Sequence, residues 1–212
     1  MNAVYYKKYL DKINRSQKEK TKRENFIRLD KNEKVSKISH KEINLFIKKI
    51  KSEDITSYTN PNEAYNKIAK LNELKISNIL ITSGADAAIK HCFEVYVKEK
   101  SEVISLNPTF AMLDIYVKIF NAKPNYVKVK LKNNKFSFNI QNLLLKITNK
   151  ASLIYLPNPN SPDGSIVSLE NIERIVSKAK KFKIPVLIDE AYIEFSKINH
   201  IGLIKKYNNL IL

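Results

Sequence analysis

The sequence lacks three features that would each define a class of protein: a disulfide framework, a metal-ligand pattern and a long apolar run. Its single cysteine, Cys92, cannot form an intramolecular disulfide, which favours a reducing compartment. His91 adjoins Cys92 on a different part of a predicted helix, and His40 and His200 are distant in sequence, so no metal-ligand spacing exists. No run approaches the roughly 20 apolar residues of a membrane span, and residues 1–23 lack the apolar core and cleavage site of a secretory signal. We therefore expect a cytoplasmic protein with no membrane partner.

Acidic residues are also scarce, because 21 Asp+Glu stand against 38 Lys+Arg and give a formal net charge of +17. Such an excess would attract nucleic acid or anionic lipid if it were gathered on one face. The lysines are instead scattered along almost every predicted helix, together with abundant Asn and Ile, as in a coding sequence rich in A and T. We expect a solvated lysine-rich surface and no nucleic-acid partner; DNA binding with a steep salt dependence is the alternative that charge alone supports.

The length and composition fit one large domain preceded by a basic segment. With 212 residues, 43% of them hydrophobic and 28% charged, the chain can bury one substantial core. Residues 1–28 are polar and basic and are predicted to form an arm or tail, while residues 29–212 are predicted to form one domain. Two helix starts stand out in that domain: Ser39 followed by Glu42, a capping box, and Asn60-Pro61 followed by an acidic first turn.

From residue 78 onward, short apolar runs alternate with amphipathic segments. The runs are predicted to be strands: 79–83, 102–106, 125–131, 152–156, 185–189 and 209–212. The segments between them are predicted to be helices: 85–98, 109–120, 139–147 and 169–182. Strands without polar alternation are buried on both faces, and intervening helices supply the crossovers that parallel strands need. The predicted fold class is therefore α/β, with a mostly parallel central sheet and helices on both of its faces.

Four loops follow predicted strands, and in a parallel sheet all four open at one edge, where ligands bind. Gly84, Ala85 and Asp86 lead directly into a helix, whose free N–H groups favour a phosphate, although Asp86 also fits an ordinary first-turn acid. Phe110, after the next strand, is suited to lie against a planar ring, or equally to be a core residue at a helix start.

Asp189 is the most informative residue of the set. A carboxylate at the end of a buried strand is costly to desolvate unless it meets a positive partner, so Asp189 is expected to face a ligand. Placed against a pyridine nitrogen, it would keep that nitrogen protonated and electron-withdrawing. Tyr192 is suited to bond a phenolate oxygen on the same ring, with Asn160 or Ser161 holding that oxygen from the other side.

Four segments read in chain order carry a resemblance: GADAAI, NPTFAM, PNPNSPDG and DEAYIEF, which begin at residues 84, 107, 157 and 189. Together they resemble the large domain of the fold type I pyridoxal-phosphate-dependent aminotransferases, most closely the histidinol-phosphate aminotransferases, over roughly residues 26–212. The resemblance implies pyridoxal 5'-phosphate as cofactor, an amino donor and a 2-oxo acid or related carbonyl as substrates, and a homodimer.

The same resemblance implies a role for each site residue. The backbone of Gly84, Ala85 and Asp86 binds the cofactor phosphate, Phe110 stacks on the pyridine, Asp189 pairs with its nitrogen and Tyr192 bonds its phenolic oxygen. Tyr58 resembles the tyrosine that reaches the neighbouring subunit's phosphate, and Asn32 resembles part of the strip that closes over the substrate. The family places its ring-oxygen asparagine directly before a proline, where this chain has Ser161, so Asn160 is the first choice for that contact.

The family's covalent lysine is not among the matching residues. Fold type I enzymes carry it on a serine-lysine loop soon after a strand like NNLIL, and the sequence ends in that strand at Leu212. We therefore expect a chain truncated before this lysine, with a partial large domain that is catalytically incomplete. Lys205 and Lys206 precede the strand on a predicted surface helix, and neither is expected to be the nucleophile.

Three other interpretations remain open at this stage. The chain could be a catalytically silent partner that dimerises with a full-length relative through Tyr58 and the N-terminal arm, or a decayed fragment. A lyase similar to threonine-phosphate decarboxylase shares loops of the DEAY type. Extending the reading frame beyond Leu212 separates a truncated product from an enzyme that keeps its lysine.

Overall fold

The structure is a computed structural model that describes residues 7–13, 23–28 and 33–212. The chain divides into two compact units. The sheet unit comprises residues 1–15 and 82–212, and the helical unit comprises residues 16–81. Within the described ranges, no helix combines the length and hydropathy that crossing a bilayer requires.

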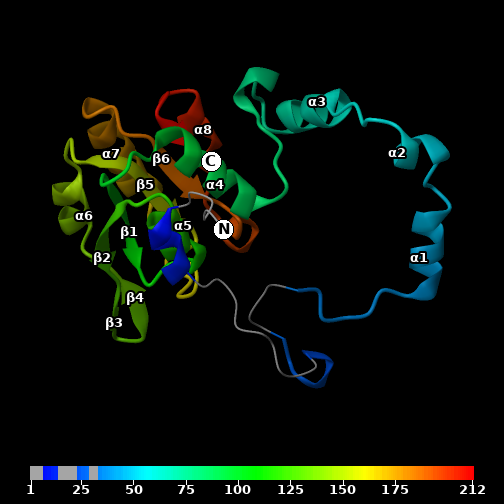
Figure 1. Cartoon of the computed structure of the whole chain (residues 1–212), viewed down its shortest axis with the longest axis horizontal. Coiled ribbons are helices and arrows are strands. Elements are labelled where there is room, and N and C mark those ends of the chain that lie inside the picture. Colours follow the sequence, from blue (N-terminus) through cyan, green and yellow to red (C-terminus); the bar gives the residue numbers. More distant parts are fainter. Residues whose placement is uncertain (1–6, 14–22, 29–32) are drawn as a thin grey trace, which may run out of the picture. The chain divides into compact units, whose positions relative to one another are not determined.

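Figure 1 labels the elements in chain order. The α-helices are α1 (His40–Ile47), α2 (Ser52–Thr56), α3 (Asn62–Leu71), α4 (Ala85–Tyr96), α5 (Met112–Ile119), α6 (Ile140–Lys146), α7 (Leu169–Lys181) and α8 (Ile201–Ile204). The strands are β1 (Glu102–Asn107), β2 (Lys123–Lys128), β3 (Lys130–Lys132), β4 (Lys135–Ser137), β5 (Ala151–Pro157), β6 (Val186–Asp189) and β7 (Leu210–Ile211). Short 3-10 helices lie at η1 (Lys8–Lys12), η2 (Arg23–Asn25), η3 (Ile76–Asn78) and η4 (Ile193–Phe195).

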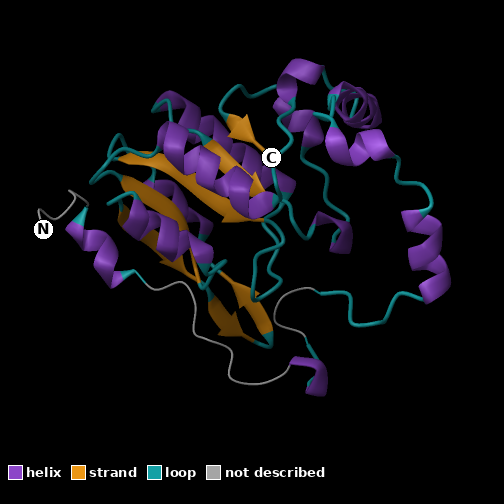
Figure 2. Ribbon diagram, turned by 45° about the vertical axis from the view of Figure 1, so that its right-hand side comes forward, coloured by secondary structure: helices purple, strands orange, loops and turns teal. Residues whose placement is uncertain are grey.

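The sheet unit is built on a five-stranded sheet in the order β2-β1-β5-β6-β7, and neighbouring strands in it pair in parallel. This confirms the predicted parallel sheet. The pairing that matters most for function joins β5 to β6, because its last register pair is Pro157 with Asp189. The ends of these two strands, and the loops that follow them, therefore lie side by side. A separate antiparallel hairpin of β3 and β4, which the sequence did not predict, extends from the sheet (Figure 2).

Helices cover both faces of the sheet, as predicted (Figure 2). On one face, α6, α7 and α8 bury residues such as Leu143, Ile172 and Leu203 against the sheet. On the other face, α4 and α5 bury Phe93 and Leu113. Consecutive strand residues alternate between the two clusters, as the pleat requires. Apolar runs without polar alternation are thus explained by burial on two sides.

The helical unit contains α1, α2 and α3, and its buried core is very small. Ala69 of α3 is the only buried residue in these three helices. Both predicted helix starts are present: Ser39 and Glu42 form the reciprocal capping box at α1, and the Asn60 side chain accepts the Asn62 N–H at the start of α3. Caps of this kind depend on neighbouring residues alone, which is why the sequence predicts them well.

One predicted strand is wrong. Residues 79–82 have no regular structure, although their apolar run resembles those that form strands. Leu80 and Ile81 are exposed, and neither takes part in a strand pairing. A strand needs a neighbour to complete its ladder of backbone hydrogen bonds, and no described strand of the chain offers one here.

Cys92 belongs to α4 and packs against the buried cluster that α4 forms with α5, as expected for a small core residue. Burial raises the pKa of its thiol, so less thiolate is present at neutral pH than for a free cysteine. We expect alkylation of the folded chain by iodoacetamide at pH 8 to be slowed by roughly threefold to tenfold, and to speed up as pH rises. The urea-unfolded chain is the control. Equal rates in the folded and unfolded chains would contradict this prediction.

Candidate functional site

The candidate site lies where β1, β5 and β6 end. Because these strands are parallel, their carboxyl ends share one edge, where Asp189 ends β6 and the loops after β1 and β5 carry Phe110 and Asn160. The Asn158 N–H donates to the Asp189 carbonyl at 2.9 Å, which continues the pairing one step beyond β5. A backbone hydrogen bond therefore joins the loop after β5 to the end of β6.

Asp189 is held in place by two hydrogen bonds from neutral donors. The Tyr155 hydroxyl donates to Asp189 Oδ2 at 2.7 Å, and the Ala191 N–H donates to Oδ1 at 3.0 Å. Tyr155 lies on β5 and is completely buried, whereas Asp189 is only partly buried. Each carboxylate oxygen has two lone pairs, so both oxygens keep the capacity to accept another hydrogen bond. The carboxylate is thus oriented by the protein and still able to bind a donor.

Tyr155 is a permanent donor at this site. Burial raises the pKa of its phenol far above the ordinary value, and the negative charges of Asp189 and Asp86 add to the shift, as does Tyr192. The hydroxyl therefore stays protonated throughout the accessible pH range. Of the predicted site residues, Asp189 contacts this phenol directly, through the hydrogen bond to Oδ2.

The first turn of α4 is the helix start for which the sequence predicts phosphate binding. Gly84 caps this helix with a φ of +93°, which glycine adopts without the steric cost of a side chain. The Asp86 carboxylate accepts a hydrogen bond from the Tyr116 hydroxyl of α5 at 2.8 Å. The first N–H groups of a helix have no partner within it and favour an anion. This helix start suits an anionic group, and its place in the site stays a prediction.

Asn160 connects the loops after β1 and β5. It is buried, its Oδ1 accepts from the Thr109 hydroxyl at 3.1 Å, and its Nδ2 donates to the Pro108 carbonyl at 3.0 Å and to Asp163 at 2.8 Å. The amide is thus used to hold two loops together. Phe110, in the first of these loops, is partly buried and packs against the cluster of α4 and α5.

The structure does not test two of the predicted site residues. Tyr58 belongs to the helical unit and is fully exposed. Asn32 lies outside the described residues. The roles of both remain predictions.

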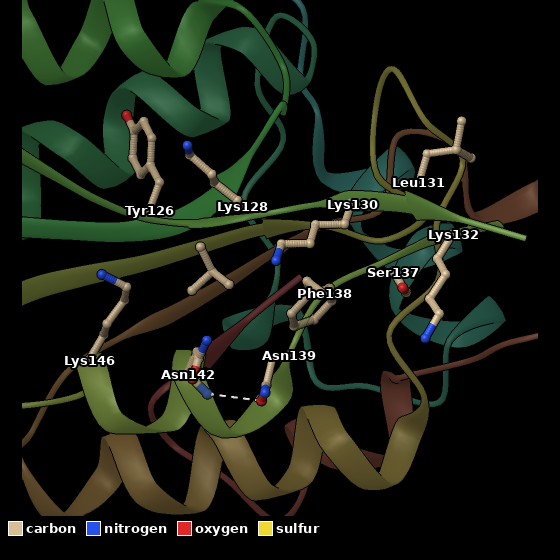
Figure 3. Close-up of a pocket in the computed structure, with 11 residues that line it drawn as sticks. Tyr126, Lys128, Lys130, Leu131, Lys132, Ser137, Phe138, Asn139, Asn142 and Lys146 are labelled. Atoms are coloured by element: carbon tan, nitrogen blue, oxygen red, sulfur yellow. Dashed lines mark hydrogen bonds between the residues drawn. The ribbon is translucent and has the colours of Figure 1, made fainter. Parts of the chain in front are cut away.

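A second hollow, of about 850 Å³, lies between β2, the β3–β4 hairpin and α6 (Figure 3). Four of its lining residues are lysines, and none of its lining residues is acidic: Lys128, Lys130, Lys132 and Lys146. None of the predicted cofactor residues lines it. β2 is an edge strand, and lysines on such strands prevent pairing with another chain. Of the four lysines, Lys128 lies on β2 and is explained by that protection, and we do not assign the hollow a ligand.

Comparisons with known proteins point to one family. The family model of the class I and II aminotransferases matches residues 24–212. The histidinol-phosphate aminotransferase of Francisella philomiragia is 36% identical over 154 residues, which cover 72% of this chain and 42% of that protein. The enzyme of the same name from Brachyspira hyodysenteriae is 31% identical over 201 residues, covering 92% of this chain and 53% of that protein. The chain therefore belongs to the class I and II aminotransferase family.

Solved structures support the same fold. The crystal structure of the histidinol-phosphate aminotransferase from Clostridium acetobutylicum matches with a TM-score of 0.64 at 24% identity, over 80% of this chain and 48% of that one. A PLP-bound C-S lyase from Staphylococcus hominis gives a TM-score of 0.64 at 13% identity, over 80% of this chain and 46% of that one. The chain spans about half the length of the curated relatives it matches.

Sequence reasoning missed the residues that orient the site. Tyr155 sits inside an apolar strand and was grouped with the core, while Tyr116 was one aromatic among several in a predicted helix. A tyrosine in an otherwise aliphatic buried strand is itself a signal, because its hydroxyl needs a partner. The sequence does not reveal which partner it meets.

Proposed function

We propose that this protein is a pyridoxal-phosphate-dependent aminotransferase of the histidinol-phosphate aminotransferase type. It would transfer an amino group between an amino donor and a 2-oxo acid or related carbonyl. The observation that carries the proposal is Asp189, a partly buried carboxylate at a strand end whose hydrogen-bond donors, Tyr155 and the Ala191 N–H, are both neutral. In the described ranges, no lysine, arginine or histidine forms an ion pair with it. Such a group suits a ligand that brings its own positive charge.

The described residues fit pyridoxal phosphate at both of its ends. The first turn of α4 would hold the phosphate, and Asp189 would hold the ring nitrogen. Tyr192 is the proposed donor to the phenolic oxygen, with Asn160 as its counterpart. Ser161, whose hydroxyl makes no hydrogen bond in the described part of the chain, is the alternative to Asn160. When bound, the cofactor supplies an electron-withdrawing ring, and these residues bind it and set its orientation.

We propose no catalytic lysine among the described residues. Lys206 pairs with Glu173 of α7, and its ammonium lies 5.4 Å from the ring centre of Tyr207. Lys205 ends α8 and, like Lys206, precedes β7. A base that moves a proton at the reacting carbon must reach that carbon, and neither lysine lies on a loop that follows a strand at the site edge. The site residues would therefore bind and orient the cofactor without forming a covalent bond to it.

The proposal extends to assembly. A homodimer in the cytoplasm would place Tyr58 near the partner's cofactor phosphate, and Asn32 would help to cover the substrate. Support comes from α1, which exposes Ile43, Phe46 and Ile47 at helical spacing. Exposed apolar residues in such a stripe favour contact with another surface.

Cofactor binding is tested by titrating the chain with pyridoxal phosphate, followed by borohydride reduction and mass spectrometry. We expect saturable, reversible binding and no lysine that carries a stoichiometric label. Absence of binding would remove the cofactor assignment. A full label on one lysine would show instead that the nucleophile lies within these 212 residues.

The reaction type is tested on the full product of the reading frame that encodes these 212 residues. With histidinol phosphate and a 2-oxo acid, we expect the amino group to appear on the acceptor. Release of carbon dioxide from an amino acid without such transfer would favour the decarboxylase-type lyase. A product that binds the cofactor and catalyses neither reaction would favour the catalytically silent partner.

A further inference from the structure

His200 is a completely buried imidazole beside the candidate site. It precedes α8, and both of its ring nitrogens have partners. Nδ1 lies 2.5 Å from Glu190 Oε1, and Nε2 lies 3.2 Å from Asn158 Nδ2. Glu190 directly follows Asp189, and Asn158 begins the loop that holds Asn160. His200 therefore contacts both of the loops that follow β5 and β6, although it belongs to neither.

The Asn158 amide has only one possible orientation. Its Oδ1 accepts the Val167 N–H at 2.9 Å, and its Nδ2 donates to the Val167 carbonyl at 2.9 Å. Exchanging the oxygen and nitrogen would place donor against donor and acceptor against acceptor. Nδ2 therefore faces His200, and it can only donate.

This orientation determines the protonation state of the ring. Because Asn158 Nδ2 donates, His200 Nε2 must be the unprotonated acceptor. The remaining proton is on Nδ1, which donates to Glu190. A proton on Nε2 would set two donors against each other in a buried place, where an unmade hydrogen bond is costly. The network thus requires the neutral ring with its proton on Nδ1.

We propose that His200 is a positioning residue that fixes the loops after β5 and β6 relative to each other and so aims the Asp189 carboxylate at the cofactor ring. The Asp189 part of this inference rests on the proposed function. The physical reason is that Asp189 is the last residue of β6, so the backbone after it has no strand ladder to hold it. Anchoring the next side chain, Glu190, limits rotation of that backbone. Groups that support a binding residue in this way commonly change ligand affinity tenfold or more when removed.

The first test needs no cofactor. The 15N shifts of the imidazole should show the Nδ1-protonated neutral ring for His200, because the network demands it. The Ala191 amide, which donates to Asp189 Oδ1, should exchange its hydrogen at least about threefold faster in a His200→Leu variant. The Ile154 amide, in the middle of the sheet, serves as the internal reference for global unfolding.

The second test uses pyridoxal phosphate as the probe. His200→Leu should weaken its binding roughly tenfold. His200→Asn carries an amide that can donate to Glu190 where Nδ1 does, so it should recover most of the affinity although asparagine is smaller than leucine. His91→Leu, which removes an exposed histidine of α4, is the matched control and should bind as the original chain does.

The outcomes separate this inference from the proposed function. If the original chain does not bind pyridoxal phosphate, the proposed function fails, and the exchange and 15N results still decide the role of His200. The inference is overturned if His200→Leu leaves Ala191 exchange and cofactor affinity within twofold of the original chain. It is also overturned if all amides, Ile154 included, speed up equally, or if His200→Asn binds no better than His200→Leu.

Discussion

Replacing Asp189 with asparagine is expected to weaken pyridoxal phosphate binding by roughly 10- to 100-fold, equivalent to about 1.4–2.8 kcal/mol. Asparagine keeps the shape and can still accept from Tyr155, but it removes the charge that a protonated ring nitrogen would meet. No described cation pairs with Asp189, so the loss is not offset by freeing another group. Isothermal titration calorimetry of the two chains measures the difference.

Glu194→Gln is the matched control for that experiment. Glu194 lies five positions further on, is exposed, and its substitution removes the same charge. We expect it to change the affinity by less than about twofold, since exposed charges are screened by solvent and salt. Equal losses in both variants would mean that only net charge matters, and the assignment of Asp189 to the ring nitrogen would be rejected.

Replacing Phe93 with alanine is expected to lower the free energy of unfolding by about 3–5 kcal/mol. Phe93 of α4 is completely buried, and its ring centre lies 5.6 Å from those of both Tyr116 and Phe120. The substitution removes this packing and leaves a cavity that the parallel sheet cannot fill by collapse. Since whole domains are stable by only about 5–15 kcal/mol, the effect should be large in a urea titration followed by circular dichroism.

Val95→Ala tests whether this loss comes from burial or from the helix itself. Val95 lies on the same helix with 71% of its surface exposed, and we expect a change within about 0.5 kcal/mol. Phe93→Leu should fall between the two if the alanine variant cannot be purified. A loss below 1 kcal/mol for Phe93→Ala would show that α4 is not held by this cluster.

The elements that were predicted correctly are those that local pattern decides. The aliphatic runs of β1, β5 and β6 lack polar alternation, so they can only be strands with two buried faces. Ser39 and Asn60 mark helix starts because a cap needs only the next two or three residues. Residues 79–82 have the same apolar pattern but are not a strand, because no neighbouring strand among the described residues forms backbone hydrogen bonds with them.

In the candidate site, too, some features follow from the local sequence and others from the pairing of distant strands. The position of Asp189 at a strand end follows from the sequence, because the apolar run stops there. Its contact with Tyr155 follows from the register of β5 against β6, and a shift of one residue would turn Tyr155 to the opposite face. Asn160 was predicted to reach a ligand; the structure shows that its amide also binds Thr109 and Asp163, and its contact with the ring oxygen stays a prediction.

By itself, the sequence determined the parallel α/β architecture, the family and the acid at the end of β6, because each depends on residues close together in the chain. The hydroxyl that holds that acid, and the contacts by which the buried His200 joins Glu190 to Asn158, could be identified from the folded chain alone. These contacts join residues 34, 10 and 42 positions apart. Hydrogen bonds act only at short range, so such partners meet only after the strands have paired and the helices have packed.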